Sequence, residues 1–365
     1  MKIIIDTYIP YIKGALEEVA DVEYLPYEQI TREKIRDAEV LIVRTRTRCD
    51  EQLLSGSKVK FIASATIGYD HIDAVYCAKN GIVWTNAPSC NALSVTQYMA
   101  SALSFLSRRN RFELSDKTIG IVGVGAVGSR IAALARSFGM RVLLNDPPRE
   151  RREQNDAFVP LNRICEEADI ITFHTLLNLS GADKTLHLAD ECFFNYLQRN
   201  PIIINAARGE IIDTAALLNA GKNKQVSDIV LDCWEKEPVI NRELLSLTTL
   251  ATPHIAGYSA DGKANAASQS VQAVSHFFGL GLDNWNCCNL PKPYHINFVP
   301  NLSETQFFTE TYNIEADSAL LKRNPAGFEQ QRSNYPFRRE PKAYSDLMTE
   351  KFRENFVEQF KVFFS

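Results

Sequence analysis

The chain has 365 residues, of which 45% are hydrophobic and 23% charged, and its formal net charge is −4 at pH 7. This length is enough for two or three domains with cores of their own, and the composition is that of an ordinary globular protein. The slight acidic excess argues against a protein whose main partner is the phosphate backbone of nucleic acid. No apolar stretch is long enough to cross a bilayer and the first residues lack a signal-peptide pattern, so we expect a cytoplasmic protein with no membrane partner.

The eight cysteines are scattered along the chain, and only Cys287 and Cys288 are adjacent. Adjacent cysteines are poorly placed to pair with each other, and no Cys-x-x-Cys spacing occurs. We therefore expect reduced thiols and no metal site.

The first 95 residues alternate short apolar runs with segments of helical character, such as residues 11–19. Alternation at this spacing is typical of a parallel sheet wrapped by helices. The expected strands are residues 2–6, 40–44, 61–65 and 83–85. An apolar-periodic run over 92–106 then predicts one long helix.

A glycine-rich turn follows an apolar strand at residues 119–122. The turn comprises Gly123, Gly125, Ala126, Val127 and Gly128, with Val124 between the first two glycines. A helix over 129–138 and a strand over 141–145 come next, and that strand ends in Asp146. In a dinucleotide site the glycines let the backbone approach a pyrophosphate, and an acid about 20 residues on binds the ribose.

The same pattern favours NAD over NADP as the cofactor. The Asp146 carboxylate would accept hydrogen bonds from ribose hydroxyls and would repel a 2′-phosphate. The nearby Arg149 is the one feature that favours NADP.

A second series of strands is expected at residues 170–173, 202–205, 229–232 and 249–252. Each of these strands ends in or beside a polar residue. In open α/β sheets ligands gather at the carboxyl ends of the strands, so a site is expected at this edge.

Three residues after these strands suit hydride-transfer chemistry. Arg208 has a planar guanidinium that can hold a substrate carboxylate through two parallel hydrogen bonds, although a surface arginine in a turn is an equal alternative. A pairing of Glu237 with His254 would fix the imidazole tautomer and suit a base that takes a hydroxyl proton. An isolated histidine is more often structural, and it is the expected pairing that favours catalysis.

Two further groups carry open alternatives. Asp232 ends a strand where it could face a nicotinamide, and helix capping is the alternative; its neighbours Cys233 and Trp234 are expected in the core. In the first domain Arg44, Thr45 and Arg46 form a polar strand end that suits a substrate phosphate, although a solvated basic edge is the commoner outcome. A second polar strand end begins at Thr66.

The character of the sequence changes from about residue 286. A proline-containing linker at 289–293 leads into a segment rich in Phe, Tyr and charge. We expect a strand over 294–299 and an amphipathic helix over 344–364.

Taken together, these motifs resemble those of the D-isomer-specific 2-hydroxy acid dehydrogenases. The resemblance rests on the glycine turn, on Asn205 with Arg208 and Gly209, on Asp232 with Glu237 and Pro238, and on Pro253 with His254. It runs the full length of the chain, including the added C-terminal segment.

The resemblance implies an α/β protein with two Rossmann-like parallel-sheet domains and a C-terminal α+β dimerisation domain. The implied boundaries are 1–95 plus 258–285 for substrate, 96–257 for NAD and 286–365 for the C-terminal domain of a homodimer. It implies NAD-dependent oxidation of a small phosphorylated 2-hydroxy acid. The alternatives are another family member such as phosphoglycerate dehydrogenase, or an NADH-sensing corepressor.

The resemblance also assigns roles to residues. Arg208, Glu237 and His254 are implied to be catalytic, and Thr45, Thr66 and Tyr258 to contact the substrate beside Arg44 and Arg46. Besides the glycine turn, the implied NAD contacts are Asp146, Thr175, Ala206, Ala207, Arg208, Asp232 and Gly257.

Overall fold

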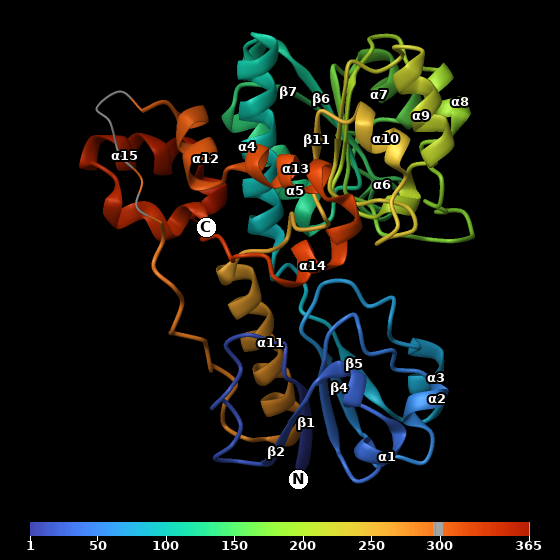
Figure 1. Cartoon of the computed structure of the whole chain (residues 1–365), viewed down its shortest axis with the longest axis vertical. Helices are drawn as coiled ribbons and strands as arrows, with labels where there is room; N and C mark the ends of the chain where they lie inside the picture. Colours follow the sequence, from blue (N-terminus) through green and yellow to red (C-terminus); the bar gives the residue numbers. More distant parts are fainter. Residues whose placement is uncertain (295, 297–301, 365) are drawn as a thin grey trace. The chain divides into compact units, whose positions relative to one another are not determined.

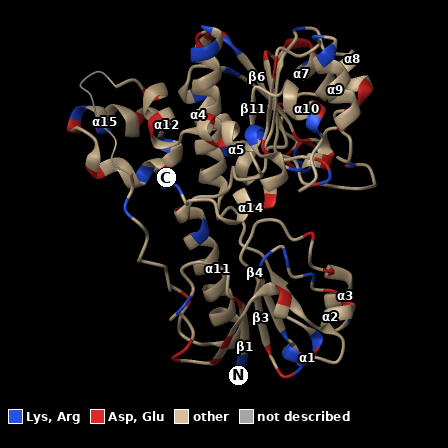
Figure 2. Ribbon diagram, in the orientation of Figure 1, with Lys and Arg blue, Asp and Glu red and all other residues tan. Residues whose placement is uncertain are grey.

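The computed structural model describes residues 1–294, 296 and 302–364. The chain divides into two compact units (Figure 1). The first unit comprises Met1–Asn91 and Ser259–Lys292, and the second comprises Ala92–Tyr258 with the described residues from Pro293 onward. Figure 2 shows Lys and Arg interspersed with Asp and Glu in both units.

The first unit is built on a five-stranded parallel sheet with the order β2-β1-β3-β4-β5. Its central strands β1, β3 and β4 are buried almost throughout, as continuous Ile- and Val-rich runs predict for a sheet covered on both faces. The strands are β1 Lys2–Asp6, β2 Asp21–Leu25, β3 Val40–Val43, β4 Phe61–Ser64 and β5 Val83–Thr85. The short helices are α1 Arg32–Ile35, α2 Glu51–Leu54 and α3 Ala74–Lys79.

A long helix from far along the chain completes this unit. Helix α11, Ala260–Phe278, begins where Ser259 accepts a hydrogen bond from the Gly262 amide and ends at Gly279, whose φ is 68°. Its apolar face packs beside β4, as Figure 1 shows for the gold helix and the blue strands.

One expected helix is wrong. Residues 11–19 form a series of turns, and β2, which the sequence reasoning missed, follows directly. Gly14 lies in the middle of this stretch with φ 83°, a left-handed conformation that interrupts a helix.

The second unit contains a six-stranded parallel sheet with the order β11-β10-β9-β8-β6-β7. A parallel bridge between Leu144 and Phe158 adds a further position beside β7. The strands are β6 Thr118–Val122, β7 Arg141–Asn145, β8 Ile170–Phe173, β9 Ile202–Asn205, β10 Asp228–Leu231 and β11 Leu250–Ala251. The chain runs from β6 outward to β7 and returns on the other side of β6 as β8, so the switch point of this Rossmann-like sheet lies between β6 and β8.

Helices cover this sheet and connect its strands. They are α4 Ala92–Asn110, α5 Ala126–Ser137, α6 Pro147–Glu153, α7 Leu161–Glu167, α8 Glu191–Asn195, α9 Thr214–Lys222 and α10 Arg242–Leu247. Helix α4 is longer than the 15 residues expected and is buried along most of its length.

The described part of the C-terminal segment is helical and packs on the second unit. Its helices are α12 Glu304–Thr311, α13 Ile314–Arg323, α14 Phe328–Ser333 and α15 Glu350–Gln359. Helix α12 lies along α4 (Figure 1), and phenylalanines of α12 and α15 share one apolar cluster with α4. The strand expected over 294–299 falls almost entirely outside the described residues. The helix expected over 344–364 is instead the shorter α15, with 3-10 turns on either side.

Helix α13 covers the edge strand β11. The Ala251 amide donates to Ser318 Oγ at 3.0 Å, and Lys322 Nζ donates to the carbonyl oxygens of Thr248 at 2.5 Å and Thr249 at 3.2 Å. These contacts satisfy backbone groups that a further strand would otherwise pair with. Among the described residues, no helix has the length and apolar character needed to cross a membrane.

Candidate active site

The glycine-rich turn lies at the switch point of the second sheet. Gly123 has φ 87°, and a Cβ at this position would lie 2.6 Å from the Thr175 amide nitrogen after β8. A Cβ on Gly128 would lie 2.0 Å from the Gly123 carbonyl oxygen, so this glycine lets α5 pack onto the turn. Beside Gly125 there is open space. This cradle, at the N-terminus of α5, fits the pyrophosphate of a dinucleotide.

Asp146 lies at the end of β7 and is tied to the turn. Its Oδ2 accepts from the Val124 amide at 2.8 Å, and its Oδ1 accepts from the Arg149 amide at 3.0 Å, which caps α6. The Arg149 guanidinium is held by Glu153 through two hydrogen bonds of 2.8 Å. Since Glu153 neutralises Arg149, the acid at this position dominates, and the site favours NAD.

Thr175 supplies an unpaired polar group at the same switch point. Its Oγ1 is buried and has no hydrogen-bond partner among the described residues. A buried hydroxyl is stable only when it is hydrogen-bonded, so this atom fits a polar group of a bound cofactor.

Arg208 is held at the end of β9 by the side chain of Asn205. The Asn205 Nδ2 donates to the Arg208 carbonyl oxygen at 2.9 Å, and its Oδ1 accepts from the Ala207 amide at 3.1 Å. A Cβ on Gly209 would lie 1.9 Å from the Trp234 carbonyl carbon, so only glycine allows the loops after β9 and β10 to approach this closely. The Arg-Gly pair therefore brings Arg208 beside the loop that carries Glu237.

Glu237 and His254 form a hydrogen-bonded couple. The His254 Nδ1 lies 2.8 Å from Glu237 Oε2, and Glu237 Oε1 accepts from the Trp234 amide at 2.9 Å. Burial alone would raise the pKa of Glu237, but the His254 ring, the Arg332 guanidinium and the Trp234 amide outweigh it and the pKa is lowered. The carboxylate is therefore ionised and suited to orient the imidazole.

The backbone at His254 is held in an uncommon conformation by Asp232. His254 has φ 58°, a left-handed value that costs free energy outside glycine. The buried Asp232 accepts from Thr252 Oγ1 at 2.6 Å, from the Ile255 amide at 2.7 Å and from the Ala256 amide at 2.9 Å. Asp232 thus fixes the loop after β11, a role different from the helix cap considered above.

Cys233 links the Arg208 loop to the couple. Its thiol donates to the Ala207 carbonyl oxygen at 3.3 Å, and its Sγ lies within 4.8 Å of ligand atoms of both Glu237 and His254. Such a trio of side chains can in principle bind a metal. Burial, however, raises the pKa of the Cys233 thiol well above its ordinary value, and a protonated, hydrogen-bonded thiol is a poor ligand.

The remaining predicted residues of the second unit lie close by in the chain. Ala206 precedes Ala207 in the Asn205-held turn, and Gly257 and Tyr258 follow the two amides bound by Asp232. The Tyr258 amide donates to the Ile255 carbonyl oxygen at 2.9 Å, which closes a turn. Tyr258 also lies next to Arg332, whose guanidinium carbon is 6.0 Å from the ring centroid.

The polar strand ends of the first unit form a separate group. Arg44 follows β3 and donates from Nε at 3.0 Å to Oδ2 of the buried Asp6, which ends the neighbouring strand β1. Thr45 and Arg46 are exposed. Thr66 Oγ1 lies 2.8 Å from Ser64 Oγ, which in turn lies 3.1 Å from His71 Nε2. Basic and hydroxyl side chains are thus gathered at the carboxyl edge of this sheet.

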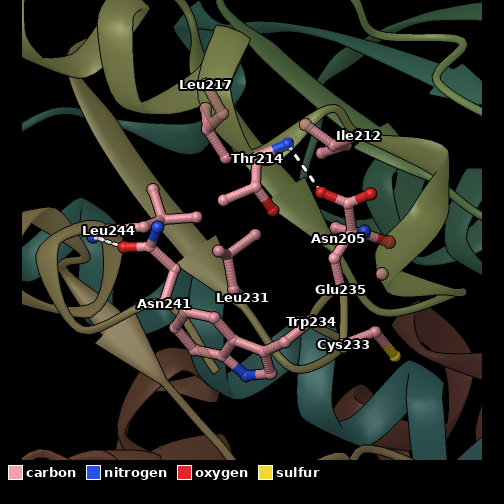
Figure 3. Close-up of a pocket in the computed structure, with 11 residues that line it drawn as sticks. Asn205, Ile212, Thr214, Leu217, Leu231, Cys233, Trp234, Glu235, Asn241 and Leu244 are labelled. Atoms are coloured by element: carbon pink, nitrogen blue, oxygen red, sulfur yellow. Dashed lines mark hydrogen bonds between the residues drawn. The ribbon is translucent and has the colours of Figure 1, made fainter. Parts of the chain in front are cut away.

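A small cavity on the second unit is not the substrate site. It has a volume of about 10 Å³ and lies between the loops after β9 and β10 and helices α9 and α10. Figure 3 shows the side chains of Leu217, Leu231 and Trp234 around it, with Glu235 accepting from the Thr214 amide at 2.9 Å. This volume holds at most one water molecule.

Several residues with contacts in these groups were missed by sequence reasoning, among them Asp6 and Arg332. Asp6 could have been found, because an acid that ends a buried strand beside an arginine-bearing strand end predicts a pair. Arg332, 3.8 Å from Glu237 Oε2, lies in a segment without a motif and gave no signal.

Comparison with known proteins agrees with this geometry. Residues 94–256 match the family model described as D-isomer specific 2-hydroxyacid dehydrogenase, NAD binding domain. A curated relative from Bacteroides thetaiotaomicron, named erythronate-4-phosphate dehydrogenase, is 51% identical over 346 residues and is matched over 99% of its length and 94% of this chain. The chain belongs to the erythronate-4-phosphate dehydrogenase family. A relative of the same name from Yersinia pestis is 40% identical, with 93% of each chain covered.

Solved structures of the wider family share the fold. D-lactate dehydrogenase from Aquifex aeolicus, complexed with NAD and lactic acid, has a TM-score of 0.64 and 25% identity, and covers 79% of this chain and 99% of its own. NAD⁺-bound 3-phosphoglycerate dehydrogenase of Entamoeba histolytica has a TM-score of 0.65 and 26% identity, with 80% and 99% covered. The chain is therefore an NAD-dependent oxidoreductase of the D-2-hydroxyacid dehydrogenase family.

Proposed function

We propose that this chain oxidises 4-phospho-D-erythronate to 3-hydroxy-2-oxo-4-phosphooxybutanoate with NAD, as a step of pyridoxal phosphate (vitamin B6) biosynthesis. The relatives named erythronate-4-phosphate dehydrogenase support the substrate. The observation that carries the chemistry is the 2.8 Å hydrogen bond between Glu237 and His254, beside the loop of Arg208.

In this proposal His254 is the base that removes the proton of the C2 hydroxyl. Glu237 accepts from Nδ1–H, so the other ring nitrogen is free of a proton and can receive it. The ionised Glu237 stabilises the imidazolium that results. Arg208 binds the substrate carboxylate through its bidentate guanidinium, which sets C2 in place.

The cofactor would be held by the residues around the switch point. Gly123 to Gly128, Asp146 and Thr175 take its adenosine and pyrophosphate parts, and residues 206–208, Asp232 and Gly257 take the nicotinamide end. When bound, NAD accepts the hydride that leaves C2. The loss of this hydride and of the hydroxyl proton converts the alcohol to a ketone.

The phosphate of the substrate would be held by the first unit. Arg44, fixed by Asp6, offers its terminal guanidinium nitrogens to an anion, and Arg46 and the hydroxyls of Thr45 and Thr66 add further donors. Tyr258 of the second unit would add a hydroxyl contact to the substrate.

We further propose a cytoplasmic homodimer, in which the C-terminal segment makes the contact between the two chains. Its described part exposes the large apolar side chains of Leu320 and Leu347, which a contact with a second chain would cover. Light scattering of the full chain would give a mass of two chains.

The substrate is tested by the rate of NADH formation from three compounds. We expect a far higher kcat/KM for 4-phosphoerythronate than for 3-phosphoglycerate or unphosphorylated erythronate. Arg44→Met should remove most of the preference for the phosphorylated compound, whereas Arg48→Met should not, because Arg48 is 84% exposed and pairs with Asp50. A clear preference of the unaltered chain for 3-phosphoglycerate would overturn the assignment.

A further inference from the structure

Part of the C-terminal segment lies against the loop that carries His254. Residues 328–340 comprise α14 and the extended stretch after it, and they lie outside the family model, which ends at residue 256. Two arginines of this stretch, Arg332 and Arg338, contact the loop or the couple directly.

Arg338 binds the carbonyl oxygens of the loop after His254. It is 2% exposed, and its NH1 donates to the carbonyl oxygens of Ile255 at 3.2 Å and Tyr258 at 3.1 Å. Its NH2 donates to the carbonyl oxygens of Ser94, at 3.0 Å, and Ala256.

The remaining contacts of Arg338 fix the guanidinium itself. Its Nε donates to Gln97 Oε1 at 3.0 Å, and its central carbon lies 4.2 Å from the centroid of the Tyr312 ring. A charged group this deeply buried is tolerated because its donors are used and because the nearby Asp317 carboxylate attracts it.

The loop is therefore clamped through both kinds of backbone group. Asp232 accepts from the amides of Ile255 and Ala256, and Arg338 donates to the carbonyls of the same two residues. His254, immediately before them, keeps a left-handed backbone that needs such support. Loss of Arg338 would leave the carbonyl oxygens of Ile255 and Ala256 without these hydrogen bonds, and the position of the His254 side chain would be less well fixed.

Arg332 acts on the couple through its charge. Its NH1 lies 3.8 Å from Glu237 Oε2, the oxygen that is hydrogen-bonded to His254. The side chains of Arg332 and Glu237 are both 18% exposed. Its Nε is buried and has no hydrogen-bond partner in the described parts of the chain. A positive charge held here favours the ionised carboxylate and opposes the uptake of a proton by the couple.

We infer that Arg332 and Arg338 are positioning residues of the active site, by which the C-terminal segment sets the orientation and proton affinity of the His254–Glu237 couple. The inference rests on the proposed roles of His254 and Glu237. Among the described residues, the other titratable or charged groups around the couple and Arg332 are Asp232, Cys233, Arg208, Tyr258 and Glu329, and they are unchanged in the variants below.

The charge of Arg332 is tested by the pH dependence of kcat/KM for oxidation. In Arg332→Met the acidic limb should move to higher pH by about one unit, because the couple holds its proton more tightly once the neighbouring charge is gone. Arg332→Lys keeps the charge and should leave the limb in place. Arg323→Met makes the same chemical change on α13, where the Arg323 Nε donates to the Ala319 carbonyl oxygen, and serves as the control.

A purely structural role for Arg332 would lower activity at every pH without moving the limb, and that result would overturn the inference for this residue. The same shift can be followed without a substrate, by NMR of the imidazole nitrogens in the NAD-bound chain. If the unaltered chain oxidises no hydroxy acid, the proposed function fails. The difference between Arg332→Met and Arg332→Lys in the pH at which the His254 imidazole takes up its proton, measured by NMR, then still decides the inference.

Arg338 is tested by separating kcat from cofactor binding. Arg338→Met should lower kcat about a hundredfold, as expected for a misplaced base, while the Kd for NADH changes less than about threefold. An unchanged kcat in a folded Arg338→Met would overturn its role. If that variant does not fold, Arg338→Gln, which keeps two donors, is measured instead, and a kcat within twofold of the unaltered chain would equally overturn it.

Discussion

Three carboxylates, the buried Asp6 and Asp232 and the half-buried Glu237, determine most of the local geometry at the two groups of polar residues. Asp6 fixes Arg44, Asp232 fixes the loop after β11, and Glu237 fixes the His254 ring. The oxygens of each carboxylate accept hydrogen bonds from the groups that it holds in place. The chemistry proposed for His254 depends on this arrangement, since an imidazole without an oriented tautomer is a poor base.

His254→Ala should lower kcat by about a thousandfold, because it removes the base proposed for the hydroxyl proton. Binding of NADH should be nearly unchanged, since the residues expected to hold the cofactor are intact. Stopped-flow hydride transfer and NADH fluorescence titration measure the two effects. The control is His276→Ala on α11, whose side chain is 86% exposed. Full activity in His254→Ala would remove this residue from the mechanism.

At the level of elements, the site is a meeting of loops at the carboxyl edge of one parallel sheet. The loops after β9 and β10 touch through Gly209 and Trp234, and those after β6 and β8 touch through Gly123 and Thr175. Parallel strands place these loops at the same edge, and glycine allows two backbones to come into contact.

Gly209→Ala should destabilise the protein by about 3 kcal/mol, because a Cβ would overlap the Trp234 backbone and force the two loops apart. Activity should fall as well, since Arg208 and Glu237 move with those loops. Gly125→Ala is the matched change in open space, and it should leave the unfolding temperature unchanged while weakening NAD binding. Thermal unfolding with and without NAD distinguishes the two variants. Equal unfolding temperatures for them would contradict the proposed close contact.

Elements with a clear local pattern were predicted well from sequence. Strands β1, β7, β8 and β9 have the expected bounds, because each is an apolar run that ends in a polar residue or directly before one. The Glu237–His254 pairing was also expected, and its geometry is now described. The helix expected over 11–19 does not form, because Gly14 has a left-handed backbone. The spacing of the apolar residues around Gly14 does not reveal that conformation.

Contacts between distant parts of the chain could not be predicted in the same way. Arg338 binds carbonyls 83 and 244 positions away in the sequence. No spacing rule connects residues so far apart, and backbone carbonyls carry no residue-specific signal. The link from the C-terminal segment to His254 therefore required coordinates.

On the scale of the whole chain, the C-terminal segment is part of the second unit's core. Phe307, Phe308 and Phe356 are buried in the cluster that also contains residues of α4 and α5. Burial of three such rings contributes several kcal/mol, about 2 kcal/mol for each side chain.

Removal of residues 294–365 should therefore prevent the second unit from folding cooperatively. The exposed apolar face of α4 should bind a hydrophobic dye, and the unfolding transition should broaden or disappear. Calorimetry and dye fluorescence of the shortened chain, compared with the full chain, measure this. A sharp transition at the temperature of the full chain would show that the segment is dispensable for folding.

Helix α13 has a consequence for biosynthesis, since it covers β11 only after residue 322 has left the ribosome. Until then β11 is an uncovered edge strand, and the amide of Ala251 and the carbonyls of Thr248 and Thr249 can form hydrogen bonds with another chain. Neighbouring nascent copies on one messenger RNA are therefore exposed to cross-pairing through this strand until residue 322 has emerged.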